Sequence, residues 1–294
     1  MVAVISGALR GLLTPFSVEI TPRETTKLPP LSGLLDPGTA VYLTFLPNVP
    51  WEQTLDAVRW VAHDGMRPVP HIAARGVPDR ATLGRMLREL AAEGVEEVLL
   101  IAGGMAPVGE FHETVQILDS GCLEEAGIRR VGVAGHPEGH PDVADDLLTW
   151  ALAAKNRIAR DRGLDMHLVT QFTFAAEPVV AWERRLRAMG NTLPIRVGLP
   201  GVTSPAKLIK FGLSCGVGPS LSVLRKQAGG VLKLATTAAY KPEDTLLDLA
   251  AAIAADPRSL LSSAHFFPFG ALAATAEWAL DLRSRHTPRS ERSA

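Results

Sequence analysis

Cysteine is nearly absent from this sequence, because only Cys122 and Cys215 occur among its 294 residues. The two do not form a Cys-x-x-Cys pair, and neither stands near a plausible set of metal ligands, which argues against a disulfide framework and against a cysteine-based zinc site. We therefore expect both thiols to be reduced and structural.

Long apolar runs and an excess of one charge are also missing. No run reaches the ~18 apolar residues that spanning a bilayer requires, and the first fifteen residues contain Arg10 and Pro15, unlike a signal peptide. Basic and acidic side chains number 30 and 31, and no basic run is interleaved with aromatics as in many nucleic-acid-binding proteins. We expect a cytoplasmic enzyme or binding protein with neither a membrane nor a nucleic acid as partner.

What the sequence does contain is an alternation of short apolar runs with segments of helical length. With 47% apolar and 21% charged residues, the chain can bury a large core. The apolar runs read as strands. They cover residues 16–22, 40–47, 67–74, 95–103, 129–137, 166–174, 194–201 and 263–270.

The segments between these runs have the spacing of amphipathic helices. In residues 79–93, Leu83, Leu87 and Leu90 fall on one face, and residues 143–162 and 241–255 read similarly. Apolar strands that alternate with helices indicate a parallel sheet with its outer face covered. Eight such units predict a closed (β/α)8 barrel, which we expect to form a single domain over residues 1–294 with a disordered tail from 284 to 294.

A doubly wound sheet is the rival architecture. It usually carries G-x-G-x-x-G at the first strand-to-helix turn, whereas the first predicted strand here runs into Glu19-Ile20-Thr21-Pro22. The barrel is therefore favoured.

In such a barrel the active site forms where the strands end, so polar groups at these positions are candidate functional residues. In chain order they are Glu19, Thr44, His71, Gly103-Gly104, His136-Pro137-Glu138, Gln171 and the Pro200-Gly201 turn.

Glu19 is the first of these candidates. It lies between Val18 and Ile20, where burying an ionised carboxylate without a partner is costly, so we expect its pKa to rise. A carboxyl group that is protonated near neutral pH is suited to general acid catalysis. The alternative is a structural ion pair with an arginine such as Arg23.

His136 and His140 are four residues apart, a spacing that suits a metal on a helix. Pro137 and Pro141 make this stretch a loop instead, so zinc is not favoured. The two histidines, together with Glu138, either cap the loop or line a ligand.

Gln171 and Lys155 each allow two interpretations. Gln171 lies among apolar neighbours and needs a hydrogen-bond partner, which either the backbone or a ligand could supply. Lys155 follows Asp145 and Asp146 in a predicted helix, and such charges usually belong to a solvated face.

Taken in order, several short segments resemble the methylenetetrahydrofolate reductase family between about Phe16 and about Trp278. Each segment is weakly specific alone, and the order at successive predicted strands carries the resemblance. The segments are SVEITP at 17–22, PHI at 70–72, HPEGHP at 136–141, residues 145–155, TQFTF at 170–174 and LPGV at 199–202.

The resemblance implies a single-domain (β/α)8 barrel that holds FAD, takes hydride from NADH or NADPH and interconverts 5,10-methylenetetrahydrofolate and 5-methyltetrahydrofolate. It implies that Glu19 protonates the folate and that Gln171 and Phe174 bind it. It also places a set of residues at the flavin, and a homo-oligomer is possible. The implied flavin-binding residues are Thr44, His71, Ala102, Gly103, Gly104, Ala134, His136, His140, Asp146 and Lys155.

Two segments depart from the family pattern. Ala102-Gly103-Gly104 stands where the family has Arg-Gly-Asp, so an aspartate near the flavin is missing, and Phe269-Gly270-Ala271 replaces a stretch with an arginine for the folate tail. The departures fit a divergent bacterial member and leave the reaction's direction and the choice of nicotinamide open. Two alternatives also stay open: a flavin-independent folate reductase of the same fold, and a pterin-binding methyltransferase-type barrel.

Overall fold

A computed structural model describes residues 2–140, 143–214 and 239–287. Its strands form a closed barrel in the order β1 to β8, and all eight predicted strand runs fall on observed strands, so the predicted (β/α)8 fold is confirmed. The strands are β1 (Ser17–Ile20), β2 (Ala40–Leu43), β3 (Arg67–Ala73), β4 (Glu97–Ile101), β5 (Arg130–Gly135), β6 (Asp165–Thr170), β7 (Ile195–Pro200) and β8 (Leu261–Phe267).

Helices alternate with these strands, and α3, α6 and α10 correspond to the predicted helices 79–93, 143–162 and 241–255. None of the described helices is long and apolar enough to cross a membrane. The helices are α1 (Val2–Leu12), α2 (Trp51–His63), α3 (Arg80–Ala92), α4 (Thr114–Asp119), α5 (Cys122–Glu125), α6 (Asp145–Arg162), α7 (Ala176–Ala188), α8 (Pro205–Ser214), α10 (Glu243–Ala255) and α11 (Leu272–Arg285), with 3-10 turns at Pro22–Glu24, Leu31–Gly33 and Ala74–Gly76.

Two predictions, the disordered tail and the reduced thiol of Cys215, concern residues at or beyond the limits of this description. The disordered tail was predicted to begin at Ser284, but α11 continues to Arg285 because its turns pack on the core through Trp278 and Leu282. Residues 288–294 and Cys215 lie outside the described residues.

The contacts of the chain group its residues into two compact units. Unit 1 comprises residues 1–18, 135–143 and 170–294, and unit 2 comprises residues 19–134 and 144–169. Each is described by itself, and the prediction of a single domain over 1–294 stays a prediction.

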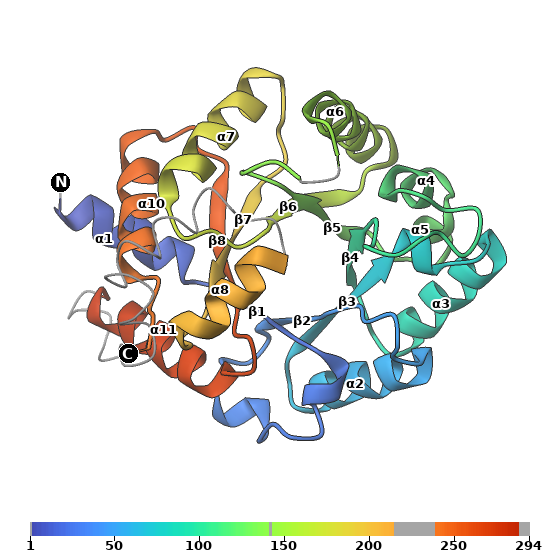
Figure 1. Ribbon diagram of the computed structural model, residues 1–294, viewed down its shortest axis with the longest axis horizontal. Coiled ribbons are helices and arrows are strands. Elements are labelled where there is room, and N and C mark those ends of the chain that lie inside the picture. The colour runs from blue at the N-terminus through green and yellow to red at the C-terminus, as the bar shows by residue number, and fades with distance from the viewer. Residues whose placement is uncertain (1, 141–142, 215–238, 288–294) are drawn as a thin grey trace. The chain divides into compact units, whose positions relative to one another are not determined.

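In unit 2, local sequence signals define the helix ends. Asp79 caps α3 by accepting a hydrogen bond from the backbone N–H of Thr82 at 2.7 Å, and this bond lowers the pKa of Asp79. α6 ends where Gly163 adopts a left-handed conformation with φ of 62°. Figure 1 shows α2 and α3 beside β3 and β4, on the outer side of the strands.

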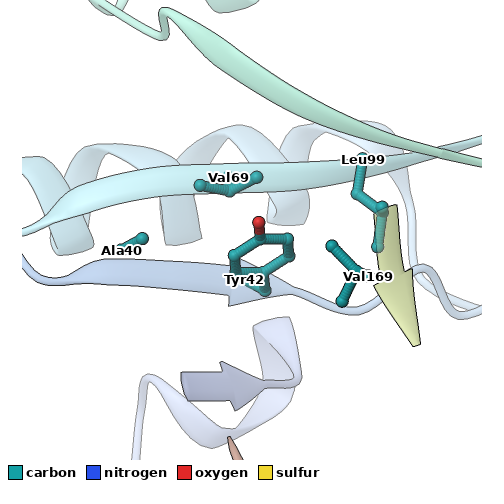
Figure 2. Packing of buried hydrophobic residues seen from close by; sticks show 5 residues of the cluster. All are labelled: Ala40, Tyr42, Val69, Leu99 and Val169. Atoms are coloured by element: carbon teal, nitrogen blue, oxygen red, sulfur yellow. The ribbon is translucent and has the colours of Figure 1, made fainter. Parts of the chain in front are cut away.

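The inward faces of these strands form the core of unit 2. Tyr42 is fully buried among Ala40, Val69, Leu99 and Val169, as Figure 2 shows. Because alternate residues of a strand face the same side, residues 67, 69 and 71 of β3 point inward together, and so do residues 40 and 42 of β2.

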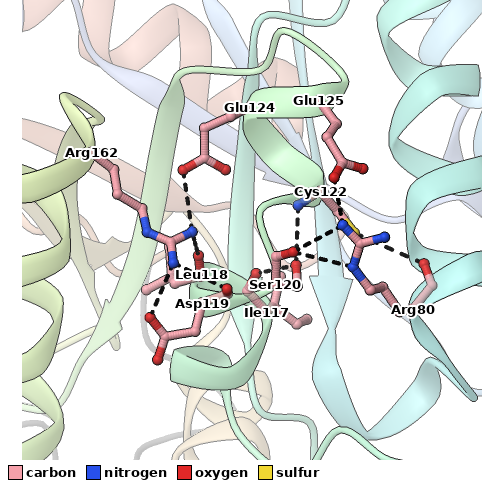
Figure 3. A network of polar contacts seen from close by, with 9 residues as sticks. All are labelled: Arg80, Ile117, Leu118, Asp119, Ser120, Cys122, Glu124, Glu125 and Arg162. Carbon is pink, nitrogen blue, oxygen red and sulfur yellow. Dashed lines mark hydrogen bonds and ion pairs between the residues drawn. The ribbon is translucent and has the colours of Figure 1, made fainter.

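The link between α4 and α5 is held by two arginines of neighbouring helices (Figure 3). Arg162 donates to the backbone oxygen of Leu118 at 2.9 Å, and Arg80 donates twice to the backbone oxygen of Ser120 at 3.2 Å. Arg80 also pairs with Glu125 at 2.5 Å, and this hydrogen bond raises the pKa of Arg80. These contacts satisfy backbone carbonyls that the short helices leave unbonded.

In unit 1, β7 and β8 pair in parallel from Ile195 to Pro200, and Figure 1 shows α1 beside α10. Arg187 of α7 contacts Glu183 at 2.9 Å and Asp256, just after α10, at 2.6 Å. Asp256 therefore has its pKa lowered to about 2, mainly through the Arg187 hydrogen bond.

Candidate functional site

Three polar side chains meet at the ends of β1, β2 and β3 in unit 2. The hydroxyl of Thr44, directly after β2, donates to Oε1 of Glu19 at 2.8 Å, and Nε2 of His71 lies 3.5 Å from Oε2 of Glu19. The Glu19 side chain is 14% exposed and that of His71 is 5% exposed. We call these three residues the Glu19 site. Of the polar groups predicted to converge where the strands end, these three lie together.

The Glu19 site is suited to moving protons. A carboxylate with one oxygen held by a hydroxyl and the other facing an imidazole has both its orientation and its charge supported. The Glu19 side chain is 14% exposed, so it is mostly but not fully buried. Arg23, the ion-pair partner considered from the sequence, donates to the backbone oxygen of Asn48 at 3.1 Å.

Below this site, a second polar group lies inside unit 2. The phenol of Tyr42 donates to Oε1 of Glu97 at 3.0 Å and lies 3.1 Å from Nε2 of His167. Because the phenol has one proton and donates it to Glu97 in a hydrogen bond, a hydrogen bond between the phenol oxygen and Nε2 of His167 needs an N–H donor at that nitrogen. We call Tyr42, Glu97 and His167 the interior polar cluster.

Two arginines at the N-terminal ends of β3 and β5 lie near the buried Glu97. Arg67 lies 3.5 Å and Arg130 lies 3.9 Å from Oε2 of Glu97, whose side chain is fully buried. A buried charge persists when opposite charges and donors surround it. Gly132 makes room for the cluster, because a Cβ there would stand 3.0 Å from Nε2 of His167 and 2.9 Å from Leu99.

The sequence analysis missed the interior polar cluster. Tyr42, Glu97 and His167 each occupy an inward position within a strand, whereas the search considered only strand ends. A polar residue in register with the inward apolar residues of its strand would have been the signal.

In unit 1, the side chains of the loop that contains His136 and His140 contact one another and Thr173. The rings of His136 and His140 meet edge to face with centroids 5.0 Å apart, and Glu138 accepts a hydrogen bond from Thr173 at 3.1 Å. Among residues 2–140, 143–214 and 239–287, no group of three or more His, Cys, Asp or Glu side chains is arranged to hold a metal.

Gln171 and Phe174, the predicted folate contacts, also lie in unit 1. Oε1 of Gln171 accepts a hydrogen bond from the backbone N–H of Phe172 at 3.1 Å, which matches the backbone alternative. Phe174 is 1% exposed and packs edge to face on Phe172 and Tyr240. Burial in this cluster raises the pKa of Tyr240 to about 12. Phe174 is thus a core residue.

Lys155 lies on the inner side of α6 in unit 2. Its side chain is half-buried, and burial lowers its pKa to about 8, with the charge of Glu113 acting in the opposite direction. The interpretation of Lys155 as part of a solvated face was wrong, because α6 turns this position toward the protein between the buried residues Ala154 and Asn156.

The other residues predicted to contact the flavin lie in unit 2, in the first turn of α6, in the segment after β4 and in β5. Asp146 accepts from the backbone N–H of Leu147 at 2.8 Å in the first turn of α6. Ala102 and Gly103 lie after β4, where Arg75 binds both of their carbonyl oxygens. Gly104 has open space at its Cβ position, and Ala134 lies in β5.

Comparisons with known proteins bear on the fold. No family model matches the chain. A candidate phosphonomutase from Burkholderia cenocepacia J2315 has a similar structure, with a TM-score of 0.50 and 11% identity over 96% of this chain and 98% of that chain. A candidate lyase or mutase from the same organism (TM-score 0.48, 16% identity, 98% and 88% covered) and an oxaloacetate acetylhydrolase (0.45, 10%, 98% and 90%) are also similar.

The structural similarity to a candidate phosphonomutase contradicts the resemblance to methylenetetrahydrofolate reductase, because that protein is of mutase type and not a folate reductase. The prediction of a flavin-dependent folate oxidoreductase, with its two folate-binding alternatives, was therefore wrong. The physical reason is that any (β/α)8 barrel places short polar segments at successive strand ends, so an ordered series of weak motifs reflects the fold more than the reaction.

FAD, NADH or NADPH, folate and a homo-oligomer were expected only through that resemblance. No described contact tests them, so they stay predictions. The absorbance spectrum of the purified protein checks the flavin directly, because a bound oxidised flavin is yellow. The three residues of the Glu19 site do not depend on the resemblance, since their contacts stand in the structure.

Proposed function

We propose that this chain is an acid–base enzyme of the lyase or mutase type and that Glu19 is its proton-transfer group. The observation that carries the proposal is the Glu19 carboxylate held between the Thr44 hydroxyl and the His71 imidazole, at 2.8 and 3.5 Å. Enzymes of this fold carry their catalytic groups at the C-terminal ends of strands, where all three residues lie.

The geometry supports distinct roles for the three residues. Glu19 takes a proton from a substrate C–H or O–H group and returns it to the product, since its side chain is 14% exposed and not sealed in the interior. Thr44 fixes one carboxylate oxygen, which leaves the lone pairs of the other directed toward the substrate or His71. His71 responds to the change in charge on Glu19 through the Nε2 to Oε2 contact.

The reaction class is supported more weakly than the role of Glu19. The names of two structures that share the fold point to lyase or mutase chemistry, and fold similarity alone does not determine a reaction. Small oxygen-rich acids are the substrates to test first, because their carbonyl groups acidify the neighbouring C–H bond that a carboxylate base attacks.

Proton NMR in deuterium oxide provides the test. The protein is incubated with a panel of 2-oxo acids, 2-hydroxy acids and phosphonates, and deuterium uptake beside the carbonyl or new product signals report turnover. We expect turnover of at least one class, reduced ~10²-fold to 10⁴-fold in Glu19→Gln.

The matched control is Glu52→Gln, an exposed carboxylate on α2 that pairs only loosely with Arg59 at 3.5 Å. It should leave turnover unchanged. Equal rates for wild type and Glu19→Gln would refute the role of Glu19, and a panel without any turnover would count against lyase or mutase chemistry on these substrates.

A further inference from the structure

The Tyr42 ring joins the other two members of the interior polar cluster, Glu97 and His167, to His71 of the Glu19 site. The rings of Tyr42 and His71 meet edge to face, with centroids 6.0 Å apart and an interplanar angle of 77°. The same ring is fully buried and anchored through its hydroxyl to Glu97 and His167. Tyr42 does not itself contact Glu19 in any described interaction.

We propose that Tyr42 is a positioning residue that orients the His71 imidazole toward Glu19. The hydrogen bonds of the Tyr42 hydroxyl with Glu97 and His167, which we call its anchor, give it this role. The inference deepens the proposed function and rests on it. Apolar packing alone leaves a ring free to shift within its pocket, whereas two hydrogen bonds at one end determine its tilt. An edge-to-face contact then transmits that tilt, since its geometry is directional.

The anchor is itself rigid. Glu97 is held from its other oxygen by Arg67 and Arg130 at 3.5 and 3.9 Å. His167 lies close to the backbone at Gly132, where an added Cβ would stand 3.0 Å from its Nε2. A chain of fixed contacts thus runs from the strand starts through Tyr42 to His71.

Coupling between Glu19 and His71 can be measured without a substrate. The protein is labelled with ¹³C-histidine, and the His71 signal among its eight histidines is the one lost in His71→Gln. The titratable groups that face His71 in the described contacts are Glu19 from β1 and Tyr42 from β2. The readout is the change in the midpoint of the His71 titration caused by Glu19→Gln.

In the wild-type background, we expect Glu19→Gln to lower the His71 midpoint by ~1 pH unit, because an opposite charge within this distance favours the protonated imidazole. In Tyr42→Phe, which keeps the ring and removes its hydroxyl, the same change should shift the midpoint by less than half as much. His167→Phe, which removes one anchor from the other side, should also reduce the shift and serves as a second variant if Tyr42→Phe folds poorly.

Val169→Ala is the matched control, since Val169 packs in the same core around Tyr42 and makes no part of the anchor. It should lower stability and keep the full shift. A full shift in both folded anchor variants overturns the role of Tyr42 and leaves the Glu19 site standing, as does an equal reduction in Val169→Ala. If Glu19→Gln moves nothing in the wild type, the pair itself is absent, and both this inference and the proposed function fail.

Discussion

The Thr44 hydroxyl donates a 2.8 Å hydrogen bond to Oε1 of Glu19, so the residue that follows β2 holds the carboxylate of β1. This bond joins two strands and also orients a side chain that is 14% exposed. Its contribution to folding and its contribution to chemistry can be separated by comparing variants that keep or lose the hydroxyl.

Thr44→Val should lower the free energy of unfolding by ~1.5 kcal/mol, because a hydrogen bond to a charged acceptor is lost without a change in side-chain shape. Urea unfolding followed by circular dichroism measures the difference. Thr44→Ser retains the hydroxyl and should stay closer to wild type. Equal losses in the two variants would mean that the methyl group of Thr44, and not its hydrogen bond, matters.

Gly132→Ala should destabilise the protein by ~1–3 kcal/mol, because the added Cβ stands 3.0 Å from His167 and 2.9 Å from Leu99 in a packed interior. The control is Gly104→Ala, whose Cβ meets open space, and it should be nearly neutral. Chemical denaturation of both variants gives the comparison. A neutral Gly132→Ala would show that the interior polar cluster is more loosely packed than its contacts indicate.

The lowered pKa of Lys155 leads us to expect a free energy of unfolding that rises at alkaline pH. Its pKa is lowered from 10.5 to about 8, so between these values the unfolded chain binds more protons than the folded protein, and the free energy of unfolding increases with pH. The displacement of about 2.5 pH units, at ~1.4 kcal/mol each, sets an upper limit of ~3.5 kcal/mol for this gain.

Lys155→Met should remove the rise between pH 8 and 10.5 and should stabilise the protein at pH 7. Unfolding measured at pH 7 and pH 10 tests both statements. Lys27→Met, at an exposed position, should leave the pH dependence as it is in wild type. A wild-type curve that is flat above pH 8 would contradict the burial of the Lys155 amine.

The lowered pKa of Asp256 leads us to expect a free energy of unfolding that falls in acid. Its pKa is about 2 in the folded protein against 3.8 for an unperturbed aspartate, so its contribution is fully present above pH 4 and is lost as the pH falls through 2. Asp256→Asn should therefore have a lower Tm than wild type at pH 6, with the gap closing toward pH 2. Asp281→Asn, at an exposed carboxylate on α11, is the control. A gap that persists unchanged at pH 2 would point to a packing effect.

The fold could be predicted from the sequence because it is repeated eight times. Apolar strand runs such as 95–103 and amphipathic segments such as 79–93 each carry a local signal, and their alternation leaves few architectures. Glu19, Thr44 and His71 could be brought together for the same reason, since the ends of neighbouring parallel strands are neighbours in space.

The rest of the site depends on information that strand ends do not contain. Glu97 and His167 join Tyr42 only once strand register is known, and His167 has room only because Gly132 lacks a side chain. Phe174 reads as an accessible aromatic near a strand end, yet it is 1% exposed in the core. The reaction is even harder to predict from the sequence, because the same barrel fold supports many chemistries.

Within unit 2, the placement of Glu97 between Arg67 and Arg130 has a practical consequence for protein engineering. Arg67 and Arg130 pair with Glu97 at the strand starts, whereas Glu19 and Thr44 lie at the strand ends. A library that varies the loops after β1 and β2 can therefore search for new substrates without disturbing the ion pairs of Glu97. Tyr42 should be kept constant in every member of such a library, because its ring contacts His71 of the Glu19 site while its hydroxyl is bonded to Glu97 and His167.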